Sequence, residues 1–489
     1  MKKKVLLSSI LTIALCLSLI AGSTYALFTS TKEFNVAITS GTVDLTAGID
    51  IDQIWSVEPT DGGSIVDEKG GTYEYVPYRN NFANGGTAVI SGAEVTLTNV
   101  TPGDKVDLIV SGTNNSNVTI QYRYVIECTE GLELMHGLKV YVNGATEGVS
   151  ALKYYTSGWM EFTVPVDDAA KAFALPVTIE LPVTAGNEYQ NKTTKIKFTV
   201  EAVQGNAATV GTQPEFVTFD TVATTAEDLG AAFAAGESVV LAADLVVDNK
   251  VSIPKNTSVT LDLNGHTLSG AFSNQGVSAV IDNNGTLTIT NGTVASLAQY
   301  PDVDWGTEGF PTYATNTISN KGNLVIEEGT VIENQTNQGG ASYAIDNYPG
   351  ATLTVNGGII KAQDVAIRLF SGSATAENKV VINGGEISGK RAIWIHLPGG
   401  SATVAPLTTV EINGGNFKST SDLTIYSYSY GNSYANTNVT ITGGTFEKAV
   451  AFGAGYYGDK ENVTITGGVF NGELGRYLEN NGWEDIVKP

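Results

Sequence analysis

Cysteine is almost absent from this sequence. The 489 residues include 2 Cys, Cys16 and Cys128. Because Cys16 lies in an N-terminal apolar run that we expect to be removed, no disulfide can form within the remaining chain. Cys128 ends the alternating stretch YRYVIEC, and this context favours a buried small side chain over a reactive thiol.

Basic residues are also scarce. The chain has 27 Lys and Arg against 50 Asp and Glu, a net charge of −23, which argues against nucleic acid as a partner. Only 16% of the residues are charged, whereas 55 are Gly. Abundant Gly and Asn together with many β-branched residues indicate an all-β protein rich in tight turns.

Long apolar runs are missing except at the N-terminus. Lys2, Lys3 and Lys4 precede the apolar run 5–20, and small residues follow it, which is the layout of a secretory signal peptide over 1–26. We expect cleavage between Ala26 and Leu27. A membrane anchor is the alternative, but sixteen apolar residues are marginal for crossing a bilayer. The C-terminal GWEDIVKP is not a sorting sequence. We therefore expect export to the surface or extracellular matrix of a Gram-positive-type bacterium, with membrane contact only through the transient leader.

The first half of the exported chain contains several alternating stretches. In VTIQYRYVIE (118–127) every second residue can face a core, as in a half-buried strand. Thr-Pro-Gly-Asp at 101–104 predicts a turn between two such strands. Many short strands separated by turns indicate a β-sandwich, which we place at 27–204.

Three segments of this half resemble one known family. AGSTYALFTSTKEFNVAITSGTVDL (21–45) resembles the leader junction of the TasA/camelysin (CalY) family, in which cleavage precedes an A-F or L-F pair. LTNVTPGDKVDLIVSGTNNSNVTIQYRY (97–124) and NEYQNKTTKIKFTVEAVQ (187–204) are similar to a strand pair and to the closing strand of that family. The resemblance implies a jelly-roll-like sandwich and a biofilm-matrix protein that forms extracellular fibres.

The same resemblance implies a way of assembling. Members of the family donate the processed N-terminal segment to the sheet of a neighbouring subunit, so the donor strand would lie within 27–47. Such pairing satisfies the free hydrogen-bonding groups of a strand and of a sheet edge. Folding of this strand into its own domain remains the alternative. The candidate donor residues begin at the expected new N-terminus and continue along the alternating stretch. They are Leu27, Phe28, Phe34, Val36 and Ile38.

Camelysin has also been described as a metalloprotease. A zincin requires two His one helical turn apart with a Glu, as in HExxH. The three histidines, His136, His266 and His396, have no such spacing. We therefore expect no protease activity and no cofactor, and no pattern in the sequence supports a structural or site calcium ion.

The second half is a repeat array. VTITGGTF (439–446) and VTITGGVF (463–470) differ at one position, and weaker copies begin at Leu261, Leu287, Leu324, Leu353, Val380 and Val410. A coil of 24–30 residues cannot bury its apolar side alone, but stacked coils form a continuous core. Propeller blades need about 40–50 residues. The period therefore predicts a right-handed parallel β-helix of about eight coils over 225–489. Within it, we expect side-chain ladders formed by Asn264, Asn291, Asn383 and Asn413.

The start of the array has its own signals. Residues 205–224 have no strong period and are interpreted as a linker. TAEDLGAAFAAG (225–236) predicts a short helix with Thr225 as N-cap, Asp228 at N3 and Gly236 at its end. A short helix leading into such coils resembles the N-terminal cap of pectate-lyase-like β-helices.

One strand of each coil suggests a binding surface. Aligning AIDNY, AIRLF, AIWIH and TIYSY, which begin at 344, 366, 392 and 424, places two columns of side chains on the outer face. Aromatic rings on a flat β-face are suited to stacking against sugar rings, although rings chosen for cross-strand packing are the plainer interpretation. The candidate glycan-binding residues of the two columns are Asp346, Arg368, Trp394 and Tyr426, and Tyr348, Phe370, His396 and Tyr428.

Catalysis is less favoured by the pattern. Hydrolysis of a glycoside uses two carboxylates on either side of one bond, whereas the aligned columns supply one Asp. Asp302 and Asp304, with Lys390 and Arg391, are the loose candidates for a lyase site. We therefore interpret the chain as a secreted matrix or adhesion protein that self-assembles or joins TasA-like subunits and contacts polysaccharide. A polysaccharide lyase or glycoside hydrolase on a matrix-anchoring domain, and a monomeric binding module, are the alternatives.

Overall fold

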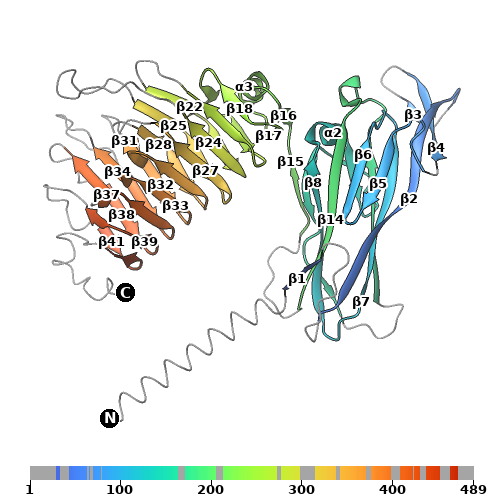
Figure 1. Cartoon of the computed structure of the whole chain (residues 1–489), viewed down its shortest axis with the longest axis horizontal. Coiled ribbons are helices and arrows are strands. Elements are labelled where there is room, and N and C mark those ends of the chain that lie inside the picture. The colour runs from blue at the N-terminus through green and yellow to red at the C-terminus, as the bar shows by residue number, and fades with distance from the viewer. Residues whose placement is uncertain are drawn as a thin grey trace, which may run out of the picture. The chain divides into compact units, whose positions relative to one another are not determined.

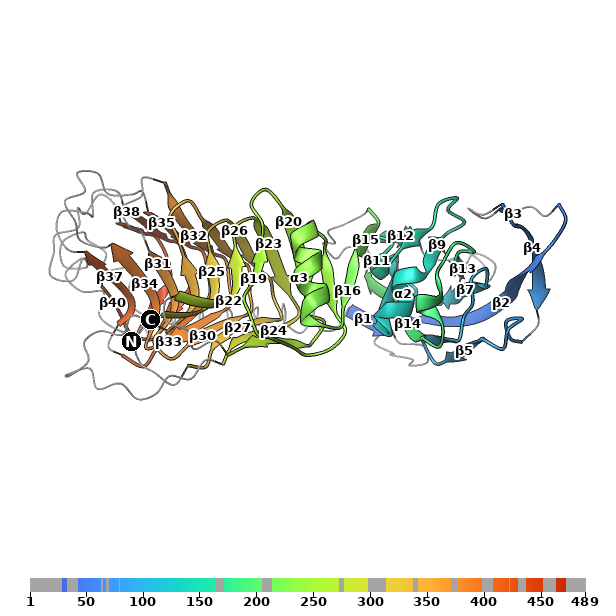
Figure 2. The same ribbon diagram turned by 90° about the horizontal axis from the view of Figure 1, so that it is seen from above.

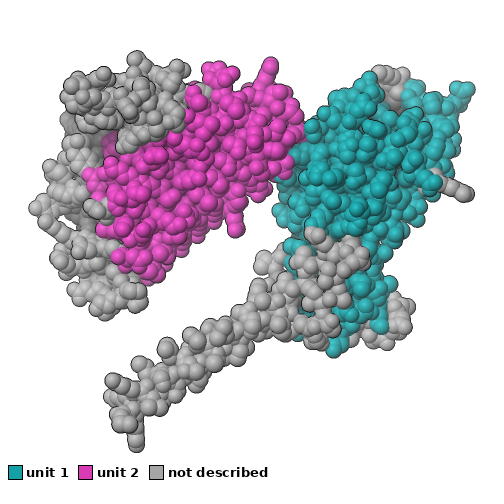
Figure 3. Space-filling view, in the orientation of Figure 1, with its two compact units in different colours: residues 1–219 teal, residues 220–489 magenta. Residues whose placement is uncertain are grey.

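The structure is a computed structural model that describes residues 29–32, 43–62, 65–66, 70–78, 80–163, 171–204, 213–271, 277–297, 314–336, 342–370, 376–397, 408–421, 423–429, 437–451 and 463–471. The chain divides into two units, residues 1–219 and 220–489 (Figure 3). Both are built almost entirely of strands (Figure 1). No helix in the described ranges is long and apolar enough to cross a membrane.

The first unit contains two antiparallel sheets. The strands of one sheet are β1 (Thr29–Lys32), β5 (Thr87–Ser91), β6 (Glu94–Thr98), β8 (Ile120–Glu130), β11 (Leu152–Thr156), β12 (Met160–Phe162), β14 (Thr193–Gln204) and β15 (Glu215–Thr218). Their order is β15-β11-β8-β14-β6-β5, with β1 paired to β14 and β12 to β8. The interior side is apolar because alternate residues of each strand point inward, as in β14, where Ile196, Phe198 and Val200 are fully buried.

The other sheet carries the long second strand. Its members are β2 (Leu45–Pro59), β3 (Ile65–Val66), β4 (Thr72–Tyr78), β7 (Lys105–Asn114), β9 (Lys139–Val142), β10 (Val149–Ser150) and β13 (Ala172–Glu180). Their order is β10-β9-β13-β7-β2-β4-β3. Two short helices, α2 (Leu132–Gly137) and η2 (Asn187–Tyr189), connect strands of the unit. β2 begins at Leu45, inside the segment 27–47 in which we expected the donor strand, and it pairs with β4 and β7 of its own unit.

The turn predicted at 101–104 is confirmed. The backbone N–H of Asp104 donates to the carbonyl oxygen of Thr101 at 2.9 Å, and the Asp104 carboxylate accepts from the Thr101 N–H at 2.7 Å. Ser56 on β2 donates to the same carboxylate at 2.5 Å. Burial raises the pKa of Asp104, so these hydrogen bonds satisfy a side chain that has little access to water.

The second unit is a solenoid of three parallel sheets. One sheet comprises β16 (Thr221–Ala223), β17 (Val239–Leu241), β20 (Ser258–Asp262), β23 (Thr286–Thr290), β26 (Asn323–Ile326), β29 (Thr352–Val355), β32 (Asn378–Ile382), β35 (Thr408–Ile412), β38 (Thr437–Ile441) and β41 (Val463–Ile465). The next comprises β18 (Leu245–Val247), β21 (Thr267–Gly270), β24 (Gly292–Ser296), β27 (Thr330–Asn334), β30 (Ile359–Ala362), β33 (Glu386–Gly389), β36 (Asn416–Ser419), β39 (Thr445–Phe446) and β42 (Val469–Phe470). The third comprises β19 (Val251–Ile253), β22 (Val277–Asn283), β25 (Ala314–Asn320), β28 (Ser342–Asn347), β31 (Val365–Phe370), β34 (Arg391–Leu397), β37 (Leu423–Ser429) and β40 (Ala449–Ala451).

The repeated phrases lie on the first and second of these sheets, one per coil. Leu287, Leu324 and Leu353 occupy equivalent positions of β23, β26 and β29. The register differs from the sequence alignment at two copies. Val259, not Leu261, aligns with Leu287, because the turn of the first copy, residues 263–266, is two residues longer than the turn of the second copy, residues 291–292. Ile332, not Val331, aligns with Val294.

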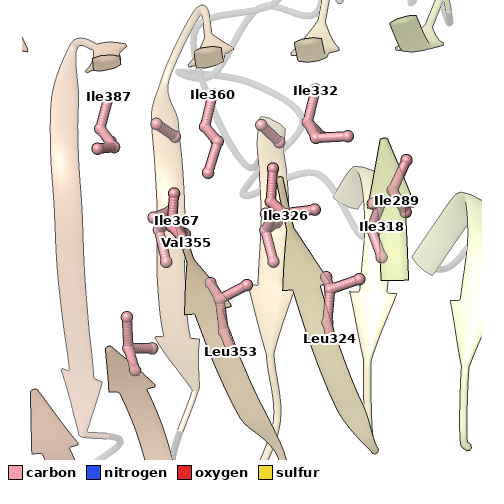
Figure 4. Close-up of a cluster of buried hydrophobic side chains, with 14 of the residues drawn as sticks. Ile289, Ile318, Leu324, Ile326, Ile332, Leu353, Val355, Ile360, Ile367 and Ile387 are labelled. Atoms are coloured by element: carbon pink, nitrogen blue, oxygen red, sulfur yellow. The ribbon is translucent and has the colours of Figure 1, made fainter. Parts of the chain in front are cut away.

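Equivalent apolar residues of successive coils stack into one core (Figure 4). Figure 4 shows Leu324 and Leu353, and Ile332 and Ile360, as neighbours along such rows. Towards the C-terminal end a row of Phe rings replaces the aliphatic side chains. Phe417 stacks on Phe446 with ring centres 4.7 Å apart, and Phe446 on Phe470 at 4.6 Å. These distances equal the usual spacing of about 4.7–4.9 Å between strands, so the rings stack without disturbing the sheet.

The two Gly of each Asn-Gly-Gly turn have different roles. The second has a positive φ, as at Gly385 (92°) and Gly415 (101°), which favours Gly. At the first, a side chain would collide with the preceding coil: a Cβ at Gly414 would lie 2.5 Å from the carbonyl oxygen of Asn383.

Asparagine ladders are present, but only two of the four predicted residues contribute. Asn413 donates to Asn383, and Asn383 to Asn356, each at 2.9 Å. Asn264 and Asn291 instead bond to the carbonyl of Leu241 and to Asp262. A second ladder is fully buried and joins Asn283, Asn320, Asn347 and Asn378, with Nδ2 to Oδ1 distances of 2.8, 2.6 and 2.6 Å.

Helix α3 (Ala226–Ala235) lies between β16 and β17 in the chain, at the first coil of the solenoid (Figure 2). The Thr225 hydroxyl accepts from the Asp228 N–H, the Asp228 carboxylate accepts from the Thr225 N–H, and Gly236 ends the helix with φ of 78°. Leu229 and Phe233 are fully buried in the same cluster as the solenoid core. The helix thereby covers apolar side chains of the first coil.

Two short strands lie in the segment interpreted as a linker. β15 pairs antiparallel with β11 of the first unit, and β16 pairs parallel with β17 of the second. The described part of this segment is therefore hydrogen-bonded to the two units in turn. Phe216 and Val217 of β15 remain exposed.

Candidate functional site

The two predicted columns lie on the sheet that contains β28, β31, β34 and β37. Asp346 is aligned with Arg368, Arg368 with Trp394, and Trp394 with Tyr426. Phe370 is aligned with His396, and His396 with Tyr428. The alignment made from the sequence therefore gives the observed register. The side chain of Tyr428 lies outside the described part of the structure.

The columns differ from the open face expected from the sequence. Asp346 is completely buried, and the side chain of Arg368 is 11% exposed. Arg368 Nε donates to Asp346 Oδ1 at 2.8 Å, and NH2 donates to Oδ2 at 2.5 Å. The two charged side chains lie on neighbouring strands. Because their charges neutralise each other, both side chains can be buried away from water.

Residues that the sequence analysis missed complete this ion pair. Asn316 Nδ2 donates to Asp346 Oδ2 at 3.2 Å. The Arg368 guanidinium lies 4.1 Å from the ring centre of Tyr343 and donates to its hydroxyl at 3.3 Å. Both residues precede the aligned Ile by two positions, which strand alternation assigns to the face of the Ile and not to that of Asp346, so periodicity did not indicate them.

Aromatic rings surround the ion pair. Tyr348 and Phe370 have ring centres 5.8 Å apart, Phe370 and His396 5.6 Å apart, and both pairs meet edge to face. Trp394 and His396 are stacked, with ring centres 4.2 Å apart. We call the five residues Tyr343, Tyr348, Phe370, Trp394 and His396 the aromatic cluster. Tyr426 lies beyond it, with the Arg391 guanidinium 4.8 Å from its ring centre.

Several polar atoms of this region are buried without a hydrogen-bond partner in the described residues. They are Asn316 Oδ1, Arg391 Nε, Trp394 Nε1 and His396 Nδ1. Burial and the nearby Arg368 charge lower the pKa of His396 to about 4, so the imidazole is neutral at pH 7. Buried polar groups are nearly always paired in folded proteins. Trp394 Nε1 and His396 Nδ1, on adjacent stacked rings, are therefore two exceptions to this rule, and both are covered from solvent.

Of the candidate residues for a lyase, Asp302 and Asp304 lie outside the described residues. Lys390 directly precedes β34, and Arg391 is its first residue. In the described ranges no group of three or more His, Cys, Asp and Glu side chains could hold a metal ion. His136 contacts the Tyr189 hydroxyl at 3.1 Å, and His266 lies 3.4 Å from Asp244.

The first unit has a second feature of interest at the edge of β14. One side of β14 is paired with β8 over most of its length. On the other side β6 covers Thr193–Lys197, and the short β1 covers Val200–Val203 with Thr29 opposite Val203. Figure 1 shows β1 beside the lower part of β14. The donor candidates Leu27, Phe28, Phe34, Val36 and Ile38, and the expected cleavage site at Ala26, lie outside the described residues.

The prediction for Cys128 is confirmed. Its side chain is buried, and the thiol lies 3.5 Å from the Thr194 hydroxyl. Burial raises the pKa of the thiol to about 11, which keeps it protonated at neutral pH.

Comparison with known proteins adds one match. Residues 1–68 match the model of the family described as camelysin metallo-endopeptidase. The match covers the residues 1–26 that we expect to be a leader, together with β1, β2 and β3, and therefore the segment that pairs with the edge of β14. No curated protein and no solved structure matches the chain.

Proposed function

We propose that this chain is an exported structural protein of a bacterial surface or extracellular matrix, in which the first unit assembles subunits and the solenoid is presented as a rigid arm. In this proposal the first unit is a TasA-like, jelly-roll-like sandwich. The solenoid is a right-handed β-helix of the pectate-lyase-like kind, and α3 is its N-terminal cap. The family match at 1–68 and the three-sheet solenoid support the proposal.

The observation that carries the assembly function is the edge of β14. Four residues of β1 pair with Val200–Val203, where β6 no longer covers the strand. Val200 and Ala202 are buried, and their backbone groups need partners along this edge. A strand whose described pairing spans four residues can be exchanged for the same segment of another subunit at small cost, because each subunit makes the same hydrogen bonds before and after.

Electron microscopy tests the assembly function. We expect the chain beginning at Leu27 to form fibres, and a variant that lacks residues 27–41 to remain as single particles. The matched control keeps all residues from Leu27 and replaces Phe34 and Ile38 by Asp. We expect this variant to assemble poorly, because charged side chains cannot enter the acceptor core. Fibres of the truncated chain at the rate of the complete chain would contradict donor-strand exchange.

The aromatic cluster is the proposed glycan contact of the solenoid. Its stacked Trp394 and His396 rings carry two nitrogens without a partner in the described residues, the indole Nε1 and the imidazole Nδ1, so that ring stacking and hydrogen bonding are proposed at one place. We expect Trp394→Ala to weaken binding of a polysaccharide in affinity electrophoresis by about tenfold or more. Tyr154→Ala, which changes a ring of the first unit, is the control. Equal affinities of the two variants would remove the cluster from the proposal.

A further inference from the structure

A polar groove runs across the strands β27, β30, β33 and β36 of the solenoid. It has a volume of about 880 Å³ and ends near Glu447, which follows β39. Since strands are about 4.8 Å apart, a groove that crosses five of them is roughly 19 Å long. It lies where these strands turn towards β28, β31, β34 and β37, whereas the aromatic cluster lies further along the latter strands. The groove and the cluster share no residue.

Ion pairs between neighbouring coils form the floor of the groove. Lys361 Nζ lies 2.6 Å from Glu333 Oε2, and Lys418 Nζ lies 2.6 Å from Glu386 Oε2. Lys361 is directly aligned with Glu333, and Lys418 with Ser388. The lysine side chains are about half exposed, so each pair offers donors and acceptors to the groove.

The charges of the lining cancel. The titratable side chains of the groove are three lysines, Lys361, Lys390 and Lys418, and three glutamates, Glu333, Glu386 and Glu447. In a chain with a net charge of −23 this neutral region is distinctive. An anionic polymer would gain no net attraction here and would be repelled by the rest of the protein. A cationic polymer would have to displace the lysines from their pairs.

The remaining lining residues select for hydroxyl groups. They are amides, hydroxyls, Gly389 and Ala362, and among the described lining residues there is no aromatic ring. A sugar hydroxyl donates one hydrogen bond and accepts others, so it can bond to a carboxylate and to an ammonium group at the same time. A polymer with regularly spaced hydroxyls matches a groove whose partners recur at every second coil.

We infer that this groove binds an uncharged polysaccharide chain, laid across the coils and held by hydrogen bonds to the Lys–Glu pairs. The inference deepens the glycan-binding part of the proposed function, but it uses other residues and another recognition chemistry. Stacking on rings contributes nothing here, since the contact is made by hydroxyl groups with charged partners. The donor-strand proposal for the first unit is independent of it.

Affinity electrophoresis of the full chain tests the inference. The gels contain one uncharged soluble polysaccharide each, namely dextran, galactomannan, xyloglucan or hydroxyethylcellulose, and polygalacturonate serves as the anionic comparison. We expect at least one uncharged polymer to retard the protein. Lys361→Ala and Lys418→Ala should each weaken that retardation about tenfold, the loss of one charge-assisted hydrogen bond.

A matched control is available on another face. Lys379 forms the same kind of pair with Glu411 on the next coil, at 2.9 Å, on the sheet that contains β32 and β35. Lys379→Ala removes the same charge and should leave the retardation unchanged. Trp394→Ala should leave unchanged the retardation that Lys361→Ala and Lys418→Ala weaken, because the tenfold loss expected for it concerns polysaccharide bound at the aromatic cluster. No retardation by any uncharged polymer, retardation by polygalacturonate alone, or equal behaviour of Lys418→Ala and Lys379→Ala would overturn the inference. Loss of binding in Trp394→Ala alone would place the glycan at the aromatic cluster instead.

Discussion

Arg368 binds the buried carboxylate of Asp346 on the neighbouring strand through two hydrogen bonds, at 2.8 and 2.5 Å. Removal of one partner leaves a charge in the interior without compensation. We therefore expect Asp346→Ala to reduce the free energy of unfolding by about 3–5 kcal/mol, measured by urea denaturation of the purified chain. The double replacement Asp346→Leu with Arg368→Met removes both charges and should recover much of this loss.

The exposed pair of Lys379 and Glu411 is the control for that experiment. Its side chains are 34% and 38% exposed, and Lys379→Ala should change the free energy of unfolding by about 1 kcal/mol or less. If Asp346→Ala and Lys379→Ala lowered the free energy of unfolding by the same amount, the buried pair would not stabilise the protein as its geometry indicates.

The buried asparagine ladder is expected to be a second determinant of stability. Asn320 donates to Asn347 Oδ1 at 2.6 Å and to the carbonyl of Thr352 at 3.0 Å. Asn320→Leu leaves both acceptors without a donor, and we expect a loss of about 2–4 kcal/mol in thermal or urea unfolding. Asn383→Ala interrupts the exposed ladder, where water can replace the amide, and should cost less than about 1 kcal/mol. A reversed order of the two losses would contradict the role assigned to the buried ladder.

The Asn-Gly-Gly turns predict where alanine is not tolerated. Gly414→Ala places a Cβ against the Asn383 carbonyl, and Gly415→Ala must adopt a φ of 101°. Each should lower stability by about 1–3 kcal/mol. Gly230 lies within α3, with nothing within 4 Å of an added Cβ, so Gly230→Ala should instead stabilise the protein by up to about 1 kcal/mol. Melting temperatures of the three variants distinguish these outcomes, and tolerance of alanine at 414 would show that the coils can separate there.

The sequence predicted the coils well because each coil repeats its own apolar positions. The Ile that recurs in AIDNY, AIRLF and AIWIH fixed the register of three strands, and with it the neighbours of Arg368. The first and third phrases were misaligned because the length of a turn, such as the one at Asn264 and Gly265, varies without changing the pattern. Periodicity also gave no sign that Asp346 is buried, because burial depends on which partners the neighbouring coils supply.

The low pKa of His396 leads to a prediction about the aromatic cluster. Its pKa is lowered from 6.5 to about 4 by burial and by the Arg368 charge. Because the folded state binds the proton more weakly than the unfolded chain, the contribution of this group to stability is complete above pH 6.5 and is lost as the pH falls towards 4. The imidazole resonances of the protein, compared with those of His396→Gln, should assign a midpoint near 4. A midpoint at or above 6.5 would mean that the ring is solvated, and the cluster open.

The exchange of the N-terminal strand is the central claim about assembly, and the register between β1 and β14 allows it to be measured directly. Ser30 lies opposite Ala202. Directly opposed residues of antiparallel strands have Cβ atoms about 4.5–5.5 Å apart, close enough for a disulfide after small adjustments. We suggest preparing two chains that begin at Leu27 and carry Cys128→Ala, one with Ser30→Cys and the other with Ala202→Cys. When they are mixed and oxidised under assembly conditions, we predict a covalent dimer of the two chains on a denaturing gel. If the mixture gives no such dimer, while a single chain with both substitutions gives only an internally linked monomer, the strand stays in its own subunit and the account of assembly is contradicted.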